Sequence, residues 1–304
     1  MDKIKATNET RRDSLWITVA LILGAIEPII VKYGYRNTVD PMQLFVVRNI
    51  AAALCLSPFI FKSNLLKILW KIAPVSILLM ATSFCTILAL KFLSAITVIT
   101  IVTCTPAVVA LINQKLGRDV LAKHFWLGFW MCFIGVIMSL EAGPIFANPI
   151  GLACVIIAVL SSSLYRVRIE QITDEVDAKV ASAVSFFVIG IISLFLMPML
   201  KEVPSYTLGL GSIVGIFAGL ANAAFVIALN RVGATRLSII TMIQRPLLII
   251  VAALILREQP TLIQAIGIVM VIIGMNYAKV TRHGNPVEEE SASTCTVPTN
   301  VCPK

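Results

Sequence analysis

Ten apolar runs, each of about 20 residues, limit what this chain can fold into. They cover residues 14–34, 42–61, 72–93, 96–114, 124–142, 148–167, 180–199, 208–229, 235–256 and 261–280. Roughly 20 apolar residues span a bilayer as a helix, and a helix supplies internal partners for backbone groups that lipid cannot bind. The runs therefore predict an all-α membrane protein with ten transmembrane helices.

Composition excludes an ordinary water-soluble protein. Of the 304 residues, 58% are apolar and only 13% are charged, whereas soluble domains carry about 25% charged residues. The net charge is +9, but the Lys and Arg residues lie in short groups between the apolar runs and not along one phosphate-binding face. We therefore expect membrane lipids as partners and no nucleic acid.

The positions of Lys and Arg predict the orientation in the membrane. With the N-terminus inside, 18 of these residues fall in inner segments and five in outer segments. Cytoplasmic loops are enriched in Lys and Arg, so this bias predicts cytoplasmic termini and location in the cytoplasmic (inner) membrane. Residues 1–13 are then a cytoplasmic N-terminal segment, and the polar residues 281–304 are a disordered cytoplasmic tail.

An offset of 139 residues aligns the first half of the chain with the second. It brings together Arg118-Asp119 with Arg257-Glu258, Gly128 with Gly267, and Gly135 with Gly274. Each half, 14–142 and 148–280, then holds five spans, and because five is odd the second half is upside down relative to the first. This predicts an inverted repeat, the construction of many secondary transporters, which bind substrate near the midplane between the halves. The aligned glycines predict faces on which helices pack closely.

On these residues the sequence resembles the drug/metabolite transporter superfamily, and within it the ten-helix EamA-type members. The matching residues are Pro41, Arg48, Ala51 to Leu54, Ala89 to Lys91, Ala95 and Pro106 in the first half, and Ala228, Ala234, Pro246, Glu258, Pro260, Gly267 and Gly274 in the second. The resemblance covers residues 14 to 280. It implies two EamA-like five-helix repeats around a central cavity, with alternating access between the two membrane faces.

The resemblance also implies a class of function. Similar proteins move amino acids, amines, nucleosides, carboxylates and toxic small molecules, often as exporters. The chain departs from the common pattern in having Asp119 where the first repeat usually places Glu, and in carrying Glu27 and Arg245 in the middle of helices. These departures bear on substrate choice, so no substrate follows from the resemblance.

Three ionisable residues deep in the predicted spans are candidates for the site. Each charged group costs about 2.5 to 3.5 kcal/mol at the centre of a span, so it needs a partner or a function. At 1.5 Å per residue, Glu27 lies about 18 Å and Arg245 about 15 Å from the inner ends of their spans, and Arg48 about 9 Å from an outer end. Glu27 can therefore lie at the same depth in the membrane as either arginine.

Two interpretations of these charges stay open. In one, Glu27 pairs with Arg48 or Arg245 only to hold helices together. In the other, an arginine binds a substrate carboxylate and Glu27 binds a substrate amine or carries a coupling proton. Gln244 and Asn222 either add hydrogen-bonding groups to the predicted substrate site or only tie helices together. Lys91, Arg166, Arg168, Arg231 and Arg236 lie nearer the ends of spans, where snorkelling to the surface explains them.

The predicted function is secondary active transport, with export favoured, of a small polar or amphoteric metabolite such as an amino acid or organic carboxylate, coupled to protons or exchange. The alternative is an antiporter of phosphorylated or nucleotide-linked metabolites. More remote are a non-transporting membrane scaffold and an intramembrane enzyme. His124 and His283 supply neither a metal set nor a catalytic base in the spans, so we expect no catalytic residues, no metal and no cofactor. A small-molecule substrate is the expected partner, and homodimer formation is left open.

Overall fold

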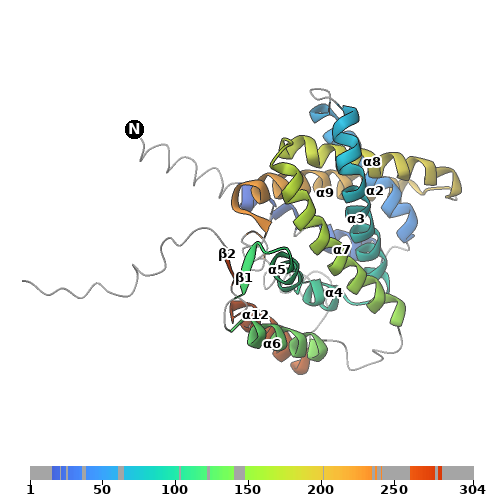
Figure 1. Ribbon diagram of the computed structural model, residues 1–304. Helices are drawn as coiled ribbons and strands as arrows, with labels where there is room; N and C mark the ends of the chain where they lie inside the picture. Colours follow the sequence, from blue (N-terminus) through green and yellow to red (C-terminus); the bar gives the residue numbers. More distant parts are fainter. Residues whose placement is uncertain are drawn as a thin grey trace, which may run out of the picture.

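A computed structural model gives the fold of the chain (Figure 1). It describes residues 16–20, 22–24, 27–35, 39–60, 65–102, 104–121, 124–139, 148–200, 202–234, 237, 241, 261–277 and 280–282. Most of the predicted ninth span, the N-terminal segment and nearly all of the predicted tail lie outside these residues.

The first half begins with a span over Trp16–Tyr35. The helices that follow are α2 (Pro41–Leu56), the 3-10 turn η1 (Ser57–Phe59), α3 (Leu65–Phe92), α4 (Ala95–Val102), α5 (Thr105–Lys115) and α6 (Phe125–Ser139). Asp40 begins α2 because its carboxylate accepts the backbone N–H groups of Met42 and Gln43, and Pro41 fits the first helical position, where no donor is needed.

The second half repeats this order. It contains α7 (Pro149–Thr173), α8 (Ala178–Leu196), η2 (Met197–Met199), α9 (Ser205–Val232) and α12 (Leu262–Tyr277). The 139-residue offset carries the bounds of α2, α3 and α6 onto those of α8, α9 and α12 to within about three residues. The repeat predicted from the sequence is therefore present in the order and lengths of the described helices.

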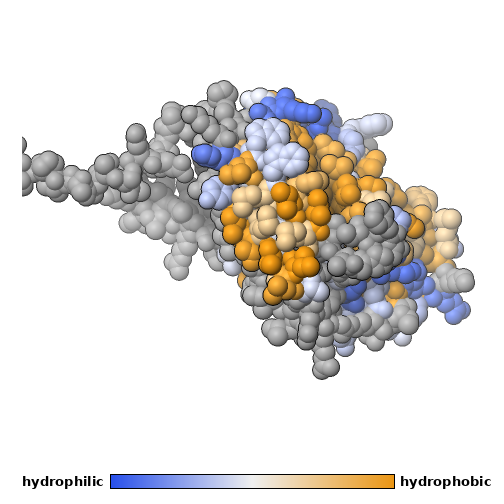
Figure 2. Space-filling model, turned by 90° about the horizontal axis from the view of Figure 1, so that it is seen from below, coloured by the Kyte–Doolittle hydropathy of each residue, from blue (hydrophilic) through white to orange (hydrophobic). Residues whose placement is uncertain are grey.

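The described helices are long and apolar enough for a membrane. Seven segments are long and apolar enough to cross a membrane, and two shorter apolar helices lie in α6 and α12. Large apolar side chains are exposed along α6, including Trp126, Trp130 and Phe133. Figure 2, seen from the side of Figure 1 on which α6 and α12 lie, shows an apolar surface of this kind. Such a surface is stable in lipid and not in water.

Contacts between helices follow a two-fold pattern. Helix α2 contacts its own counterpart α8, and α6 contacts its own counterpart α12. The pair α2 and α9 has a counterpart in the pair α8 and α3, and both pairs are in contact. Helices that contact their own counterparts lie next to the axis that relates the two halves. Gly135 of α6 packs on the backbone of Gly267 of α12, as the glycine pattern predicts.

The structure differs from the all-α prediction at one place and adds a detail at another. A short antiparallel pairing joins β1 (Asp119–Leu121) to β2 (Val280–Arg282), far apart in the sequence. The predicted fourth span corresponds to the membrane-crossing segment Ala95–Lys115, which consists of two helices, α4 and α5; Pro106 lies in the first turn of α5 and cannot donate a backbone hydrogen bond. Apolar periodicity carries no signal for either feature.

Polar side chains close the ends of several helices. Lys32 Nζ donates to the carbonyl oxygens of Leu90, at 2.9 Å, and Leu93, at 2.7 Å, where α3 ends. Just after α9 ends, Glu170 Oε1 accepts the backbone N–H of Ala234 at 3.1 Å. A lysine therefore binds carbonyls at the end of one long helix, and a carboxylate binds an amide in the segment that follows its counterpart.

The packing of α2 on α9 generates a prediction for two glycines of α9. A Cβ atom on Gly215 would overlap the carbonyl oxygen of Arg48, whereas a Cβ on Gly209 meets nothing within 4 Å. Gly215→Ala should lower the free energy of unfolding by about 1 to 3 kcal/mol, as overpacking does. Gly209→Ala is the matched control and should leave stability unchanged or slightly higher. SDS-induced unfolding in detergent measures both, and equal effects would contradict this view of the α2–α9 contact.

Candidate functional site

A cavity of about 270 Å³ lies between residues of the two halves. Most of its lining comes from the first span, α3, α7 and α9, with one residue each from α2 and α8. Its polar lining residues are Glu27, Arg48, Thr82, Ser83, Thr86, Ser162, Tyr165, Arg166, Asn222 and Thr241. The remaining lining residues are apolar or small, so charged groups and apolar surface face the same space.

Glu27 and Arg48 form an ion pair at this cavity. Arg48 Nε donates to Glu27 Oε1 at 2.7 Å, and Arg48 Nη2 lies 2.5 Å from the same oxygen. The Arg48 side chain is 7% exposed and that of Glu27 is 23% exposed, so the carboxylate faces the cavity more openly. Of the two pairings left open by the sequence, the structure contains the one with Arg48.

The remaining donor of Arg48 is also bound within the protein. Arg48 Nη1 donates to Asn49 Oδ1 at 3.0 Å and to Ser83 Oγ at 2.5 Å. Asn49 is fully buried, and its Nδ2 has no hydrogen-bond partner among the described residues. All three nitrogens of the Arg48 guanidinium therefore hold protein groups, which join α2 to the first span and to α3.

Asn222 of α9 lies in a second polar group at the cavity. Its Nδ2 donates to Ser182 Oγ at 2.9 Å, and its amide lies within 3.4 Å of the Tyr165 hydroxyl. These contacts tie α9 to α7 and α8. Asn222 is therefore both a cavity-lining residue and a tie between helices, as the sequence left open.

Arg166 lines the same cavity, although its position in the sequence favoured snorkelling at the end of a span. Helix α7 continues to Thr173, seven residues beyond Arg166 and so about 10 Å farther. The Cζ atom of Arg166 lies 4.7 Å from the centroid of the Phe225 ring, a cation–π contact. The predicted span ended at residue 167, six residues before the end of α7, and this is why Arg166 was not predicted as a cavity residue.

The 139-residue offset between the two halves relates their cavity-lining residues to one another. Five pairs of cavity-lining residues are each 139 positions apart: Glu27 with Arg166, Leu79 with Ala218, Thr82 with Ala221, Ser83 with Asn222, and Thr86 with Phe225. Applying the offset to Glu27 and Asn222, both singled out from the sequence, leads directly to Arg166 and Ser83. The cavity is thus lined by counterpart positions from the two halves, with a carboxylate at one and a guanidinium at the other.

The structure brings together three of the five site residues predicted from the sequence. Glu27, Arg48 and Asn222 line one cavity. Arg245 and Gln244 lie outside the described residues, as does most of the span that carries them.

Seven apolar segments of membrane-spanning length, the repeated halves and a charged cavity lined by both define a multi-pass membrane protein. The sequence profile of the EamA-like transporter family matches residues 13–140 and 149–277. The chain therefore belongs to the EamA-like transporter family, whose members are membrane transporters of the drug/metabolite transporter superfamily.

A solved crystal structure with 16% sequence identity resembles this fold. The match has a TM-score of 0.66 and covers 88% of this chain and 96% of that chain. At this identity the likeness bears on the fold alone. No curated protein matches the sequence.

The burial of the Glu27–Arg48 pair predicts a strong coupling between the two residues. Glu27→Gln leaves a buried guanidinium without its counter-charge and should lower the free energy of unfolding by about 3 kcal/mol. Adding Arg48→Gln should recover part of this loss, because the double variant buries no unpaired charge. A double-mutant cycle under SDS-induced unfolding measures the coupling.

The exposed pair of Lys71 and Glu175 is the matched control on α3 and just beyond α7. Its side chains are 56% and 67% exposed, and Lys71 lowers the pKa of Glu175 through a hydrogen bond and its charge. Solvent screens such a pair, so Lys71→Gln and Glu175→Gln should leave stability unchanged. Additive effects of Glu27→Gln and Arg48→Gln would show that the buried pair contributes no more than the exposed one.

Proposed function

We propose that this chain is a secondary active transporter of the cytoplasmic membrane that carries a small polar or amphoteric metabolite bearing a carboxylate. Transport occurs by alternating access and is coupled to protons or to exchange, and export is favoured by family resemblance. The cavity carries this proposal: it contains Glu27, Arg48 and Arg166 in membrane-spanning segments, where each charge is costly without a function or a partner.

Size and charge support an amino-acid-sized substrate. A cavity of about 270 Å³ lies just below the 300–1,000 Å³ typical of sites for drug-sized ligands, so it suits a smaller molecule. Its described lining has one carboxylate, Glu27, and two guanidinium groups, Arg48 and Arg166. Guanidinium groups match a carboxylate with two parallel hydrogen bonds. A phosphorylated or nucleotide-linked substrate is larger and more highly charged, and exchange of such compounds would favour the antiporter alternative.

Glu27 is the proposed coupling residue. A carboxyl group that faces a cavity of low dielectric can exchange a proton with the transported molecule or with the medium. Both Arg48 contacts use Oε1 of Glu27. Among the described residues Oε2 of Glu27 accepts no hydrogen bond, and we assign this oxygen to a proton or a substrate amine.

Reconstituted protein tests this function. Proteoliposomes loaded with amino acids, organic acids, polyamines, nucleosides or phosphorylated metabolites should show counterflow of a carboxylate-bearing compound. Glu27→Gln should reduce this transport at least tenfold and remove its dependence on pH, whereas Glu175→Gln should change neither. Unchanged transport and pH dependence in Glu27→Gln would remove Glu27 from the mechanism. Recovery of transport in Glu27→Gln/Arg48→Gln would assign the pair a structural role only.

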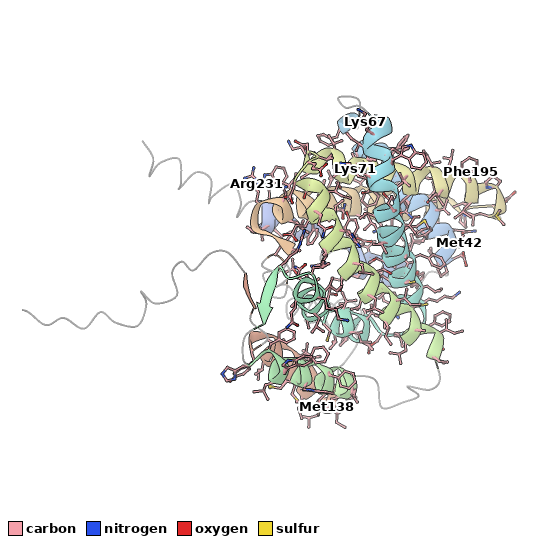
Figure 3. The ribbon with its side chains drawn as sticks, in the orientation of Figure 1. Met42, Lys67, Lys71, Met138, Phe195 and Arg231 are labelled. Atoms are coloured by element: carbon pink, nitrogen blue, oxygen red, sulfur yellow. The ribbon has the colours of Figure 1, made fainter. Side chains whose placement is uncertain are left out.

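The proposed topology has ten helices, with residues 235–256 as the ninth, inverted repeats over 14–142 and 148–280, and both termini in the cytoplasm. Figure 3 places Lys67 and Lys71 at the top of the molecule, Arg231 on the left, and Met42 and Phe195 on the right. The positive-inside rule makes the lysine-bearing side cytoplasmic.

Cysteine labelling tests this topology. Cys295 and Cys302 belong to the predicted tail, so a membrane-impermeant maleimide should label intact cells only after permeabilisation. The Cys295→Ser/Cys302→Ser variant is the control and should lose this signal. Labelling of the tail cysteines in intact cells would place the C-terminus outside.

A further inference from the structure

The two carboxylate oxygens of Glu27 are held differently. Both contacts from Arg48 go to Oε1, at 2.7 Å from Nε and 2.5 Å from Nη2. Within the described part of the chain Oε2 accepts no hydrogen bond, and the side chain lines the cavity and is 23% exposed. A carboxylate accepts hydrogen bonds at both oxygens, so the cavity wall here presents an anionic acceptor that the guanidinium does not use.

Two threonines of α3 add acceptors to the same cavity. Thr82 Oγ1 donates to the carbonyl oxygen of Leu78 at 2.8 Å, and Thr86 Oγ1 donates to that of Thr82 at 2.7 Å. A hydroxyl has one hydrogen, and in both side chains this hydrogen is bound to the preceding turn of the helix. Because both residues line the cavity, each hydroxyl meets a ligand as an acceptor while these bonds are kept.

Hydrogen bonds connect this face of α3 to the carboxylate. Ser83, which follows Thr82, accepts from Arg48 Nη1 at 2.5 Å, and Nε of the same guanidinium donates to Glu27. Ser83 and Thr86 are three residues apart in the helix and therefore lie on one face of it. One guanidinium group thus joins the first span to the hydroxyl-bearing face of α3, and both elements border the same cavity.

The second half does not repeat these acceptors. The 139-residue offset pairs Thr82 with Ala221 and Thr86 with Phe225, all four of which line the cavity. The side chains of alanine and phenylalanine have no hydrogen-bonding group. The threonine acceptors therefore belong to the first half alone, on the same side of the repeat as Glu27.

Acceptors of this kind select a ligand group that only donates. An ammonium group has a positive charge and N–H donors but no acceptor, whereas a carboxylate has only acceptors and the charge of Glu27 itself. We infer that the substrate is amphoteric and that its ammonium group binds Oε2 of Glu27 and the hydroxyl oxygens of Thr82 and Thr86. Arg48 and the ammonium group then use different oxygens of one carboxylate. This inference rests on the proposed transport function and adds to it the amine and the residues that select for it.

Matched ligands separate the amine from the rest of the molecule. L-Leucine, 4-methylpentanoate, L-2-hydroxy-4-methylpentanoate and L-leucinamide share one side chain but differ in the amine or the carboxylate. L-Phenylalanine, 3-phenylpropionate, L-3-phenyllactate and L-phenylalaninamide form a second set. Thermal unfolding of the purified full chain over a range of ligand concentrations measures affinity, because a ligand that binds the folded state raises the unfolding temperature. The wild type should bind the amino acids about tenfold or more tightly than the acids without an amine.

Variants of α3 then test the two threonines. Thr82→Val/Thr86→Val keeps the shape of both side chains and removes both acceptors, so the affinity for the amino acids should fall about tenfold while that for the amine-free acids stays unchanged. Thr82→Ser/Thr86→Ser keeps the hydroxyls and should bind as the wild type does. If the double valine variant fails to fold, Thr86→Val carries the test with a loss of about threefold.

Thr100→Val of α4 is the matched control. Thr100 Oγ1 makes the same kind of bond, to the carbonyl oxygen of Ile96 at 2.8 Å, but Thr100 does not line the cavity. This variant should bind every ligand as the wild type does. An equal loss in Thr100→Val would assign the effect to the helices and overturn the role of the two threonines.

The remaining outcomes separate this inference from the function on which it rests. A wild type that binds amine-free acids as tightly as amino acids would overturn the amine site and leave carboxylate transport standing. Undiminished binding of amino acids by the double valine variant would overturn the role of the threonines. A wild type that binds the carboxamides as tightly as the amino acids would support the amine site and contradict the proposed carboxylate. A wild type that binds none of these compounds would overturn both proposals.

Discussion

Arg48 has a positive charge within an apolar helix, and much of the surrounding structure satisfies that charge. Its nitrogens contact Glu27 of the first span, Asn49 of its own helix and Ser83 of α3, while Gly215 of α9 packs against its carbonyl oxygen. Three other membrane-spanning segments thus meet α2 at a single residue. An unpaired guanidinium in this environment is costly. The arrangement of these helices is therefore specified by electrostatics as well as by apolar packing. Apolar packing alone gives little preference for one partner helix over another in lipid.

The repeat determines where such polar contacts can form. Helices α2 and α8, and helices α6 and α12, contact their own counterparts, which places them next to the axis that relates the halves. The cavity is lined by counterpart positions, yet the two halves supply different chemistry there: Glu27 in one half and Arg166 in the other, Ser83 in one and Asn222 in the other. Repetition of the helical frame therefore does not repeat the site, because side chains at related positions differ in charge and size.

Much of the helical frame could be predicted from the sequence, since length and apolarity are enough to define a span. The sequence also singled out Glu27, Arg48 and Asn222, because charged and amide groups are rare in apolar runs. It did not predict Arg166 as a cavity residue, since the predicted span ended at residue 167 whereas α7 continues to Thr173. The β1–β2 pairing was missed because three-residue strands 161 positions apart leave no periodic pattern. The break between α4 and α5 is a local property of Pro106 that an apolar average conceals.

The two long counterpart helices are followed by polar contacts of opposite charge. At the end of α3 the ammonium group of Lys32 binds carbonyl oxygens, and just beyond α9 the carboxylate of Glu170 binds the backbone amide of Ala234. The two halves therefore share a helical frame but not the polar contacts next to it. As a consequence, the two-fold relation between the halves is approximate at these positions, and a structure in which the halves exchanged their conformations would not contain the same set of contacts.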